Sequence, residues 1–346
     1  MPFTPGFNFT EATNLLILSA HIEGDTTLPL PLNWKMIFDS GALLPFDDRW
    51  QLWQNTSSRD SAPGTYAIVV RGTVDQAGSI LEDLISLLIQ ATGSITVDGV
   101  SVDYKFAADP NASVHLGFAL GTLLLLKFPF LGILAQLALK VPPGSNIYIT
   151  GHSQGAASAT LLRSYLNYGA DRPIKNYSYK TYVFAQPKPG NDHYATDFES
   201  LFCNTGLAFR VTNSLDWVPQ GPFTIEIPSD LNIPNPLSVL TAVLSGNESS
   251  LLTALKTAQI GAIKLILPEI QAALQRNAVL LARTKDPTVV GINLFGFPLV
   301  FSLYFLGAAT EIALIGTPCS GPTQCGDVFF EHHATTYYAL MQAQLK

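Results

Sequence analysis

The segment Gly151-His152-Ser153-Gln154-Gly155 is the part of the sequence best suited to covalent chemistry. It fits the Gly-x-Ser-x-Gly pattern of a nucleophile elbow, a tight turn that lifts a serine hydroxyl to the top of a sheet. That turn needs a strand before it and a helix after it. The sequence supplies both, because residues 146–150 are a buried β-branched run and residues 154–168 are amphipathic. Ser153 is therefore predicted to be a nucleophile.

A serine hydroxyl is a poor nucleophile until a general base takes its proton. In this arrangement the chain order is serine, then acid, then histidine. Asp216 follows a predicted strand over residues 207–212 and is the best candidate for the acid. Only His332 and His333 lie beyond it among the six histidines. We favour His332 as the base, because it lies at the predicted junction of a loop and a helix, and His333 is the alternative.

Two other histidines are interpreted as structural. His152 adjoins Ser153, on a turn that we expect to direct its side chain away from the site. His115 precedes Gly117 and Phe118 and is expected to be a hydrogen-bonded core residue rather than a ligand.

The elements that must position these residues follow from the alternation of β-branched runs and helical patterns. Strands are predicted at residues 66–70, 146–150, 180–185, 207–212, 299–306 and 310–316. Helices are predicted at residues 9–22, 79–91, 114–139 with a break near Pro129, 154–168, and from about His332. This alternation predicts an α/β fold with an open, mostly parallel sheet flanked by helices.

One region interrupts the alternation. Between residues 223 and 298, apolar residues recur at helical spacing before the last strands. We expect one α/β domain over residues 1–346 that carries a helical insertion at 223–298. The helices at 236–283 are a candidate lid that contacts substrate or a lipid–water interface, and an ordinary packed helical subdomain is the alternative.

Composition excludes several classes of protein. The chain has 346 residues, of which 47% are hydrophobic and 13% charged, so it is not disordered. Its net charge is −7 and no cluster of lysine and arginine stands out, which argues against nucleic-acid binding. No metal-binding cysteine or histidine pattern and no glycine-rich phosphate loop is present, so neither a metal nor a cofactor is expected. Nothing indicates an obligate protein partner.

Cysteines and glycosylation sequons bear on localisation. Cys319 and Cys325 flank a Gly-Pro turn and are expected to form a small disulfide, with Cys203 buried. The first residues lack the basic start and long apolar run of a signal peptide. We predict a secreted protein whose signal has been removed, with a cytoplasmic protein as the alternative. Asn-x-Ser/Thr sequons, which permit secretion, occur at Asn8, Asn55, Asn111, Asn176 and Asn247.

Four further segments have a distinctive order of residues around the serine turn. They are residues 67–73 with an Arg-Gly-Thr end, 114–118 with His-x-Gly-Phe, 182–191 with Gln-Pro and Gly-Asn, and 210–219 with Arg-Val-x-Asn. Together with the serine turn they resemble class 3 lipases, the family typified by fungal triacylglycerol lipases. The resemblance covers about 200 residues, mainly 65–220 and 300–340. It implies an α/β-hydrolase fold and the hydrolysis of carboxylic esters.

The resemblance also implies an oxyanion hole. Its two donors would be Gln154, through its backbone N–H, and Thr73, through its N–H and hydroxyl. The family often has leucine at the position of Gln154, a change that leaves the backbone donor in place.

The sequence as a whole predicts a serine hydrolase for esters of apolar acyl chains, with triacylglycerol lipase as the first choice. Ser153, His332 and Asp216 would form its triad. Four alternatives remain: a carboxylesterase or feruloyl esterase, a phospholipase A1, an acyltransferase, and a non-catalytic lipid-binding protein. The partners expected are an ester or lipid substrate and a lipid–water interface.

Overall fold

The computed structural model describes residues 2–43, 48–57, 63–71, 88–97, 100–173, 176–222, 224, 299–300 and 304–346. Thr73, most of the predicted helix at 79–91 and nearly all of the predicted insertion at 223–298 lie outside these ranges.

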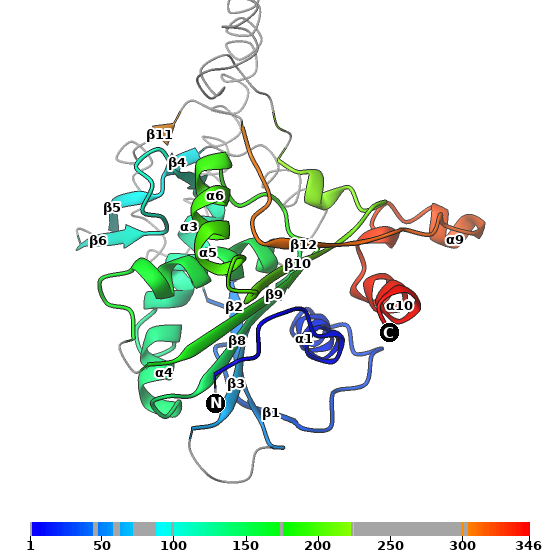
Figure 1. The fold of residues 1–346 in the computed structure, drawn as a ribbon, viewed down its shortest axis with the longest axis horizontal. Helices are drawn as coiled ribbons and strands as arrows, with labels where there is room; N and C mark the ends of the chain where they lie inside the picture. The colour runs from blue at the N-terminus through cyan, green and yellow to red at the C-terminus, as the bar shows by residue number, and fades with distance from the viewer. Residues whose placement is uncertain are drawn as a thin grey trace, which may run out of the picture.

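A seven-stranded sheet forms the centre of the molecule (Figure 1). Its order is β1 (Trp34–Asp39), β2 (Arg49–Asn55), β3 (Thr65–Arg71), β8 (Asn146–His152), β9 (Ser178–Phe184), β10 (Ala208–Asn213) and β12 (Thr310–Leu314). The pairs from β3 to β12 are parallel, and β1 and β2 extend the sheet in antiparallel pairs. The predicted α/β class with a mostly parallel sheet is confirmed.

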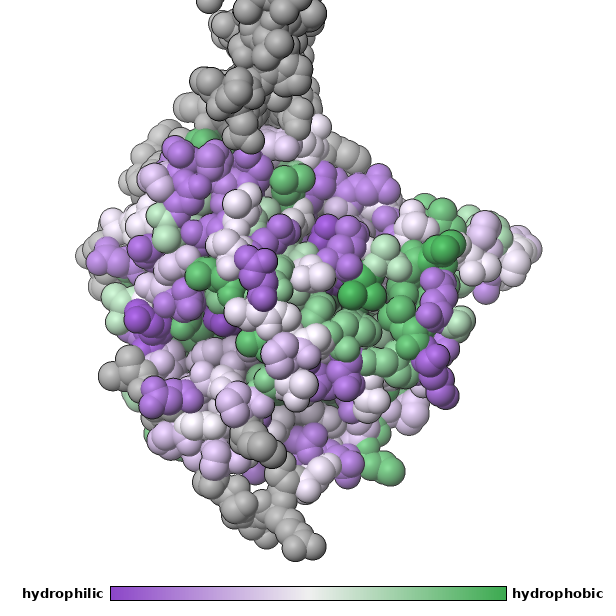
Figure 2. All heavy atoms as spheres, viewed as in Figure 1, coloured by the Kyte–Doolittle hydropathy of each residue, from purple (hydrophilic) through white to green (hydrophobic). Residues whose placement is uncertain are grey.

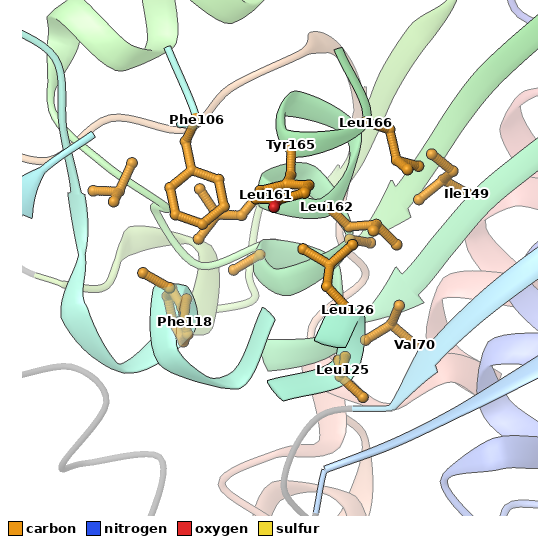
Figure 3. Packing of buried hydrophobic residues seen from close by; sticks show 14 of the residues in the cluster. Val70, Phe106, Phe118, Leu125, Leu126, Ile149, Leu161, Leu162, Tyr165 and Leu166 are labelled. Carbon is orange, nitrogen blue, oxygen red and sulfur yellow. The ribbon is translucent and has the colours of Figure 1, made fainter. Parts of the chain in front are cut away.

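Strand β3 shows how the sequence builds two layers of helices. Its side chains alternate: Ala67 and Val69 pack into one apolar cluster, whereas Ile68 and Val70 pack into the other. The first cluster lies against α1 (Phe9–Ile22) and α10 (Ala334–Gln344). The second is covered by α3 (Leu116–Lys127), α4 (Ile133–Lys140), α5 (Gln154–Tyr168) and α6 (Asp192–Phe202). Figure 3 shows Leu125 and Leu126 of α3 and Leu161 and Leu162 of α5 among the second cluster.

Local signals explain where several helices start. The side chain of Asn8 accepts a hydrogen bond from the backbone N–H of Glu11 and caps α1. His115 caps α3 through its Nδ1, which accepts from the N–H of Phe118 at 3.2 Å, and its ring stacks on that phenyl ring. The structural interpretation of His115 is therefore confirmed.

Residues 88–91 differ from the expected helix. Leu88–Gln90 form β4, which pairs antiparallel with β7 (Ser113–His115) and with β11 (Leu299–Val300) in a second, three-stranded sheet. Leu88 and Ile89 are fully buried, and a short apolar run of this kind suits either element until its neighbours are known. The helical prediction for these residues is wrong because pairing with β7 satisfies their backbone groups.

A hairpin and three short helical segments complete the described elements. β5 (Thr92–Val97) and β6 (Val100–Lys105) form a hairpin that the sequence patterns did not indicate.

Short helical segments occur at η1 (Val218–Gln220), which follows β10, and at α9 (Gly321–Cys325) and η5 (Phe330–His332) near the C-terminus. The strand expected at 310–316 is confirmed as β12. Residues 304–306 are not part of a strand, because only an isolated bridge from Leu306 to Gly190 forms there.

Of the two predictions about the cysteines, one is confirmed and the other is wrong. Cys319 and Cys325 form the predicted disulfide. Cys203 is a free thiol and is half-buried rather than buried, so that expectation is corrected. None of the helices within the described ranges combines the length and apolar character needed to cross a bilayer.

Candidate active site

Ser153 lies on a strained turn between β8 and α5. Its φ of 56° and ψ of −133° are rare for a residue with a side chain, and such a conformation costs about 1–3 kcal/mol. The turn is tight: a Cβ added to Gly151 would lie 2.3 Å from the carbonyl oxygen of Gly155. The Ser153 N–H donates to the carbonyl oxygen of Phe184 at 3.0 Å and holds the turn against β9. This is the geometry expected of a nucleophile elbow.

The structure brings Ser153, His332 and Asp216 together. His332 Nε2 lies 2.8 Å from Ser153 Oγ, and His332 Nδ1 lies 2.8 Å from Asp216 Oδ2. The carboxylate can only accept, so Nδ1 carries the proton and the neutral ring offers the Nε2 lone pair to the serine hydroxyl. The Asp216 side chain is fully buried. This arrangement can remove a proton from Ser153 and stabilise the imidazolium that results.

His333 takes no part in this arrangement. Its ring is exposed, and Nε2 bonds Asp327 Oδ2 at 2.7 Å on the surface. Between the two histidines that chain order left open, only His332 reaches Ser153.

Asp216 has two further hydrogen bonds that fix its orientation. The hydroxyl of Tyr337, on α10, donates to Oδ2 at 2.8 Å, and the N–H of Val218 donates to Oδ1 at 3.0 Å. Tyr337 also accepts from the N–H of Asn213 at 3.1 Å. Tyr337 was not among the predicted site residues, although its position a few residues after His332 was visible in the sequence.

Asn213 fixes the loop that carries the base. Its Nδ2 donates to the carbonyl oxygen and to the carboxylate Oε2 of Glu331, each at 2.9 Å. Because Asn213 ends β10, three residues before Asp216, the acid and the base are anchored to the same strand end.

His152 contradicts its expected orientation. The ring is buried and points toward the site, with Nε2 2.8 Å from the carbonyl oxygen of His332 and Nδ1 3.0 Å from Glu23 Oε2. Its centroid is 4.8 Å from that of the His332 ring. The expected orientation is wrong because the end of α1 and the loop that carries His332 both contact the His152 ring. Glu23, at the end of α1, was missed because nothing in the sequence places it near residue 152.

Burial and charge shift the two histidines in opposite directions. Burial lowers the pKa of His332 below its ordinary value, although the hydrogen bond and charge of Asp216 oppose the change. Burial alone would also lower the pKa of His152, but the charge and hydrogen bond of Glu23 raise it above the ordinary value. A positive charge on His152 disfavours a second charge on His332 and lowers its pKa further. These effects favour the neutral form of His332, which a general base requires.

The expected oxyanion donors are only partly within the described residues. Gln154 is the first residue of α5, so its backbone N–H lies at the helix end that favours negative charge. Thr73 lies outside the described ranges. The strand before it, β3, pairs with β8 in a register that sets Val70 opposite Gly151. In the residues the structure describes, no group of three or more histidine, cysteine or acidic side chains is suited to hold a metal ion.

The sequence model of the family described as lipase (class 3) matches residues 67–226. This part of the chain is similar to the class 3 lipases. The protein is a carboxylic ester hydrolase. The matched segment includes Ser153 and Asp216, whereas His332 lies beyond it and is placed beside them by its distances alone.

Several solved structures of lipases are similar to this chain. Lipase II from Rhizopus niveus is 21% identical, with 62% of this chain and 75% of that chain covered and a TM-score of 0.44. The lipase from Rhizopus microsporus var. chinensis is 22% identical, with 61% and 68% covered and a TM-score of 0.40. The triacylglyceride lipase of Rhizomucor miehei is 21% identical, with 61% and 73% covered and a TM-score of 0.40.

The segments that carried the resemblance to class 3 lipases have structural roles around the site. Gln186 is fully buried, donates to Thr160 Oγ1 and the Ala308 carbonyl, and accepts from the Ala308 N–H. It fixes the chain that leads into β12. Asn191 caps α6 and accepts from the N–H of Ser113 at 2.9 Å.

Proposed function

We propose that the protein is a triacylglycerol lipase in which Ser153, His332 and Asp216 form the catalytic triad. The observation that carries the proposal is the pair of 2.8 Å contacts linking the Ser153 hydroxyl, the His332 ring and the Asp216 carboxylate. All three groups come from segments far apart in the chain, and each is held by further hydrogen bonds. A structural role alone would not require a strained serine at the end of β8.

The mechanism follows from the proton positions. Ser153 Oγ attacks the ester carbonyl carbon as its proton passes to His332 Nε2, and Asp216 stabilises the imidazolium. The carbonyl oxygen becomes an oxyanion, for which we propose the backbone N–H of Gln154 and the N–H and hydroxyl of Thr73 as donors. His332 then returns the proton to the departing alkoxide, which leaves as the alcohol. Water, deprotonated by His332, hydrolyses the acyl-enzyme and releases the carboxylic acid.

The surface around the acid supports an apolar substrate. Leu215, Ile315 and Val328 are 43%, 76% and 70% exposed. Leu215 and Ile315 follow β10 and β12 at the strand ends that carry the site, and the carbonyl of Val328 accepts from the indole of Trp217, the residue after the acid. Figure 2 shows apolar residues gathered toward the side that carries α9 and α10. Exposed apolar side chains beside a hydrolase site are suited to contact with lipid.

Two finer features belong to the same proposal. The insertion predicted from the sequence at residues 223–298 lies outside the described residues, and we propose it as a lid or cap that contacts lipid. The protein acts outside the cell, which agrees with the Cys319–Cys325 disulfide, because such bonds persist in oxidising compartments.

The test is hydrolysis of p-nitrophenyl esters from acetate to palmitate and of an emulsified triacylglycerol. We expect turnover of the long-chain esters and of the emulsion, and a loss of at least about 10³-fold in Ser153→Ala. Ser214→Ala, which changes an exposed serine two residues before Asp216, is the matched control and should retain activity. Turnover of only short or aromatic esters would make the protein a carboxylesterase, and a preference for phospholipid would make it a phospholipase A1. No turnover above Ser153→Ala would overturn the catalytic proposal in favour of an acyltransferase or a lipid-binding protein.

A further inference from the structure

A cavity of about 480 Å³ lies at the end of the sheet where β9 and β10 begin, whereas the triad lies at the end where these strands finish. It is bounded by the last turn of α5, by the start of β9 and by the chain just before β10. The residues that line it are Pro2, Phe3, Arg163, Leu166, Asn167, Arg172, Pro173, Asn176, Tyr177, Ser178, Tyr179 and Leu207. Ser153 lies at the other end of α5, and since a helix rises ~1.5 Å per residue, about 20 Å separates the two places.

Arg163 is an unusual side chain in the wall of this cavity. It is only 9% exposed, and its guanidinium lies over the ring of Phe202 at 3.8 Å and over the ring of Tyr179 at 5.1 Å. Within the described ranges, no carboxylate pairs with it and no oxygen accepts a hydrogen bond from it. The two rings contact the guanidinium group but supply no hydrogen-bond acceptor in those contacts, so its N–H groups remain for another acceptor.

A buried guanidinium without an anion is costly, because burial penalises its charge. Burial lowers the pKa of Arg163 to about 10, so the side chain stays charged at neutral pH. The other arginines for which the structure gives ion pairs have carboxylate partners: Arg49 pairs with Asp39 and Arg210 with Glu311. Arg163 lacks the anion that those two have.

Two further polar groups lie at the same cavity. Arg172 is exposed at its rim, and one of its nitrogens donates to the carbonyl of Gly169 at 3.0 Å, which holds the side chain near the opening. The hydroxyl of Tyr179 is buried and has no hydrogen-bond partner in the described part of the chain. The remaining wall is partly apolar, through Phe3, Leu166 and Leu207.

We propose that this cavity is a binding site for a small organic oxyanion, with a carboxylate or phosphate head on Arg163 and a short apolar body against Phe3, Leu166 and Leu207. A planar guanidinium edge fits two oxygens of such a head, and Arg172 supplies a second positive charge at the entrance. The volume suits a ligand of this size. None of the triad residues lines this cavity, and ligand binding there does not depend on the proposed lipase activity.

The test is binding to the full chain by calorimetry and by thermal shift, with inorganic phosphate, acetate, benzoate and hexanoate as probes and 1-hexanol as the uncharged control. We expect benzoate and hexanoate to bind more tightly than acetate, and 1-hexanol to bind at least about tenfold more weakly than hexanoate. Phosphate binding with no carboxylate binding would identify a phosphate head, and the reverse would identify a carboxylate. Failure of all the anions to bind, or equal binding of hexanol and hexanoate, would overturn the proposal.

Variants separate this site from the acyl site. Arg163→Met should weaken anion binding by about tenfold or more, without lowering the melting temperature of the ligand-free protein. Arg172→Ala changes an exposed residue and should weaken phosphate more than acetate. Arg49→Gln removes an arginine that already has its carboxylate, and should leave the anion-induced shift unchanged. Unchanged binding in both Arg163→Met and Arg172→Ala would place the anion elsewhere and refute the site.

Discussion

His152 Nε2 lies 2.8 Å from the carbonyl oxygen of His332, so the residue next to the proposed nucleophile holds the backbone of the proposed base. On its other edge, Nδ1 lies 3.0 Å from Glu23 Oε2 at the end of α1. A carbonyl and a carboxylate both only accept, and a doubly protonated His152 donates to each of them. Two contacts therefore fix the separation of Ser153 and His332: their own side-chain contact, and the hydrogen bond from His152 to the backbone carbonyl of His332.

Replacing His152 tests whether that bond positions the base. His152→Ala removes the donor, and we expect kcat to fall about 10–100-fold with little change in KM for a soluble ester, because small misplacements of a catalytic group are costly. His152→Gln retains an N–H donor and should recover part of the loss. The measurement is steady-state kinetics with p-nitrophenyl butyrate, alongside the melting temperature of each variant.

The control for this substitution is His193, which pairs with Asp109 away from the triad. His193→Ala should keep wild-type kcat. Equal kcat for wild type and His152→Ala would show that the contact between His152 and His332 has no positioning role.

The pH dependence of activity tests the electrostatic effect of His152 on His332. The proposed mechanism requires neutral His332, so we expect activity to be lost as the pH falls through the pKa of this residue. Burial lowers that pKa, so we expect the acid limb of kcat/KM to have its midpoint below the ordinary histidine value of 6.5. The charge of His152 also lowers it, and the uncharged His152→Gln should therefore move the midpoint to higher pH. His193→Gln should not move it; a wild-type midpoint above 6.5, or a downward shift in His152→Gln, would contradict the electrostatic account.

Local sequence patterns predicted the nucleophile, and chain order reduced the remaining choices. The elbow is a local motif, since a Cβ at Gly151 would meet the backbone of Gly155 within the turn that carries Ser153. The acid could be placed because a parallel strand brings its end to the same edge of the sheet as β8. These features account for the confirmed α/β fold and for the candidate triad.

Long-range contacts explain what the sequence could not supply. Glu23 and His152 are 129 residues apart, and no periodicity links the end of α1 to the elbow. The sequence around Leu88 and Ile89 is equally compatible with a helix and with a strand, and only the pairing with β7 determines that it forms a strand. Arg163 lies on an amphipathic helix where an arginine would ordinarily be exposed, but it is buried because aromatic rings from β9 and α6 cover it.

The choice between the two adjacent histidines has its own test. We expect His332→Ala to lose at least about 10³-fold in kcat, because the base and its link to Asp216 disappear together. His333→Ala should stay within about twofold of wild type, since its contact with Asp327 is exposed and such pairs contribute little. Both variants are measured on the same soluble ester. Comparable loss in the two, or full activity in His332→Ala, would refute His332 as the base.

A buried ion pair between α1 and the sheet provides a prediction about stability. Lys180 is 1% exposed, and its Nζ donates to Glu11 Oε2 at 2.7 Å; the same oxygen accepts from the Tyr182 hydroxyl at 2.7 Å. Glu11→Gln removes the negative charge and leaves a buried ammonium uncompensated, so we expect the free energy of unfolding to fall by about 3 kcal/mol. The measurement is urea unfolding followed by tryptophan fluorescence.

The double variant decides whether the loss comes from the uncompensated charge. Adding Lys180→Met to Glu11→Gln removes the buried ammonium, and should recover stability relative to the single variant, because an apolar side chain suits the site once its partner is neutral. Asp109→Asn breaks the half-exposed pair with His193 and should cost less than about 1 kcal/mol. If the double variant is less stable than Glu11→Gln, then Lys180 stabilises the fold through its bond to the carbonyl of Thr4 at 3.0 Å rather than through its charge on Glu11.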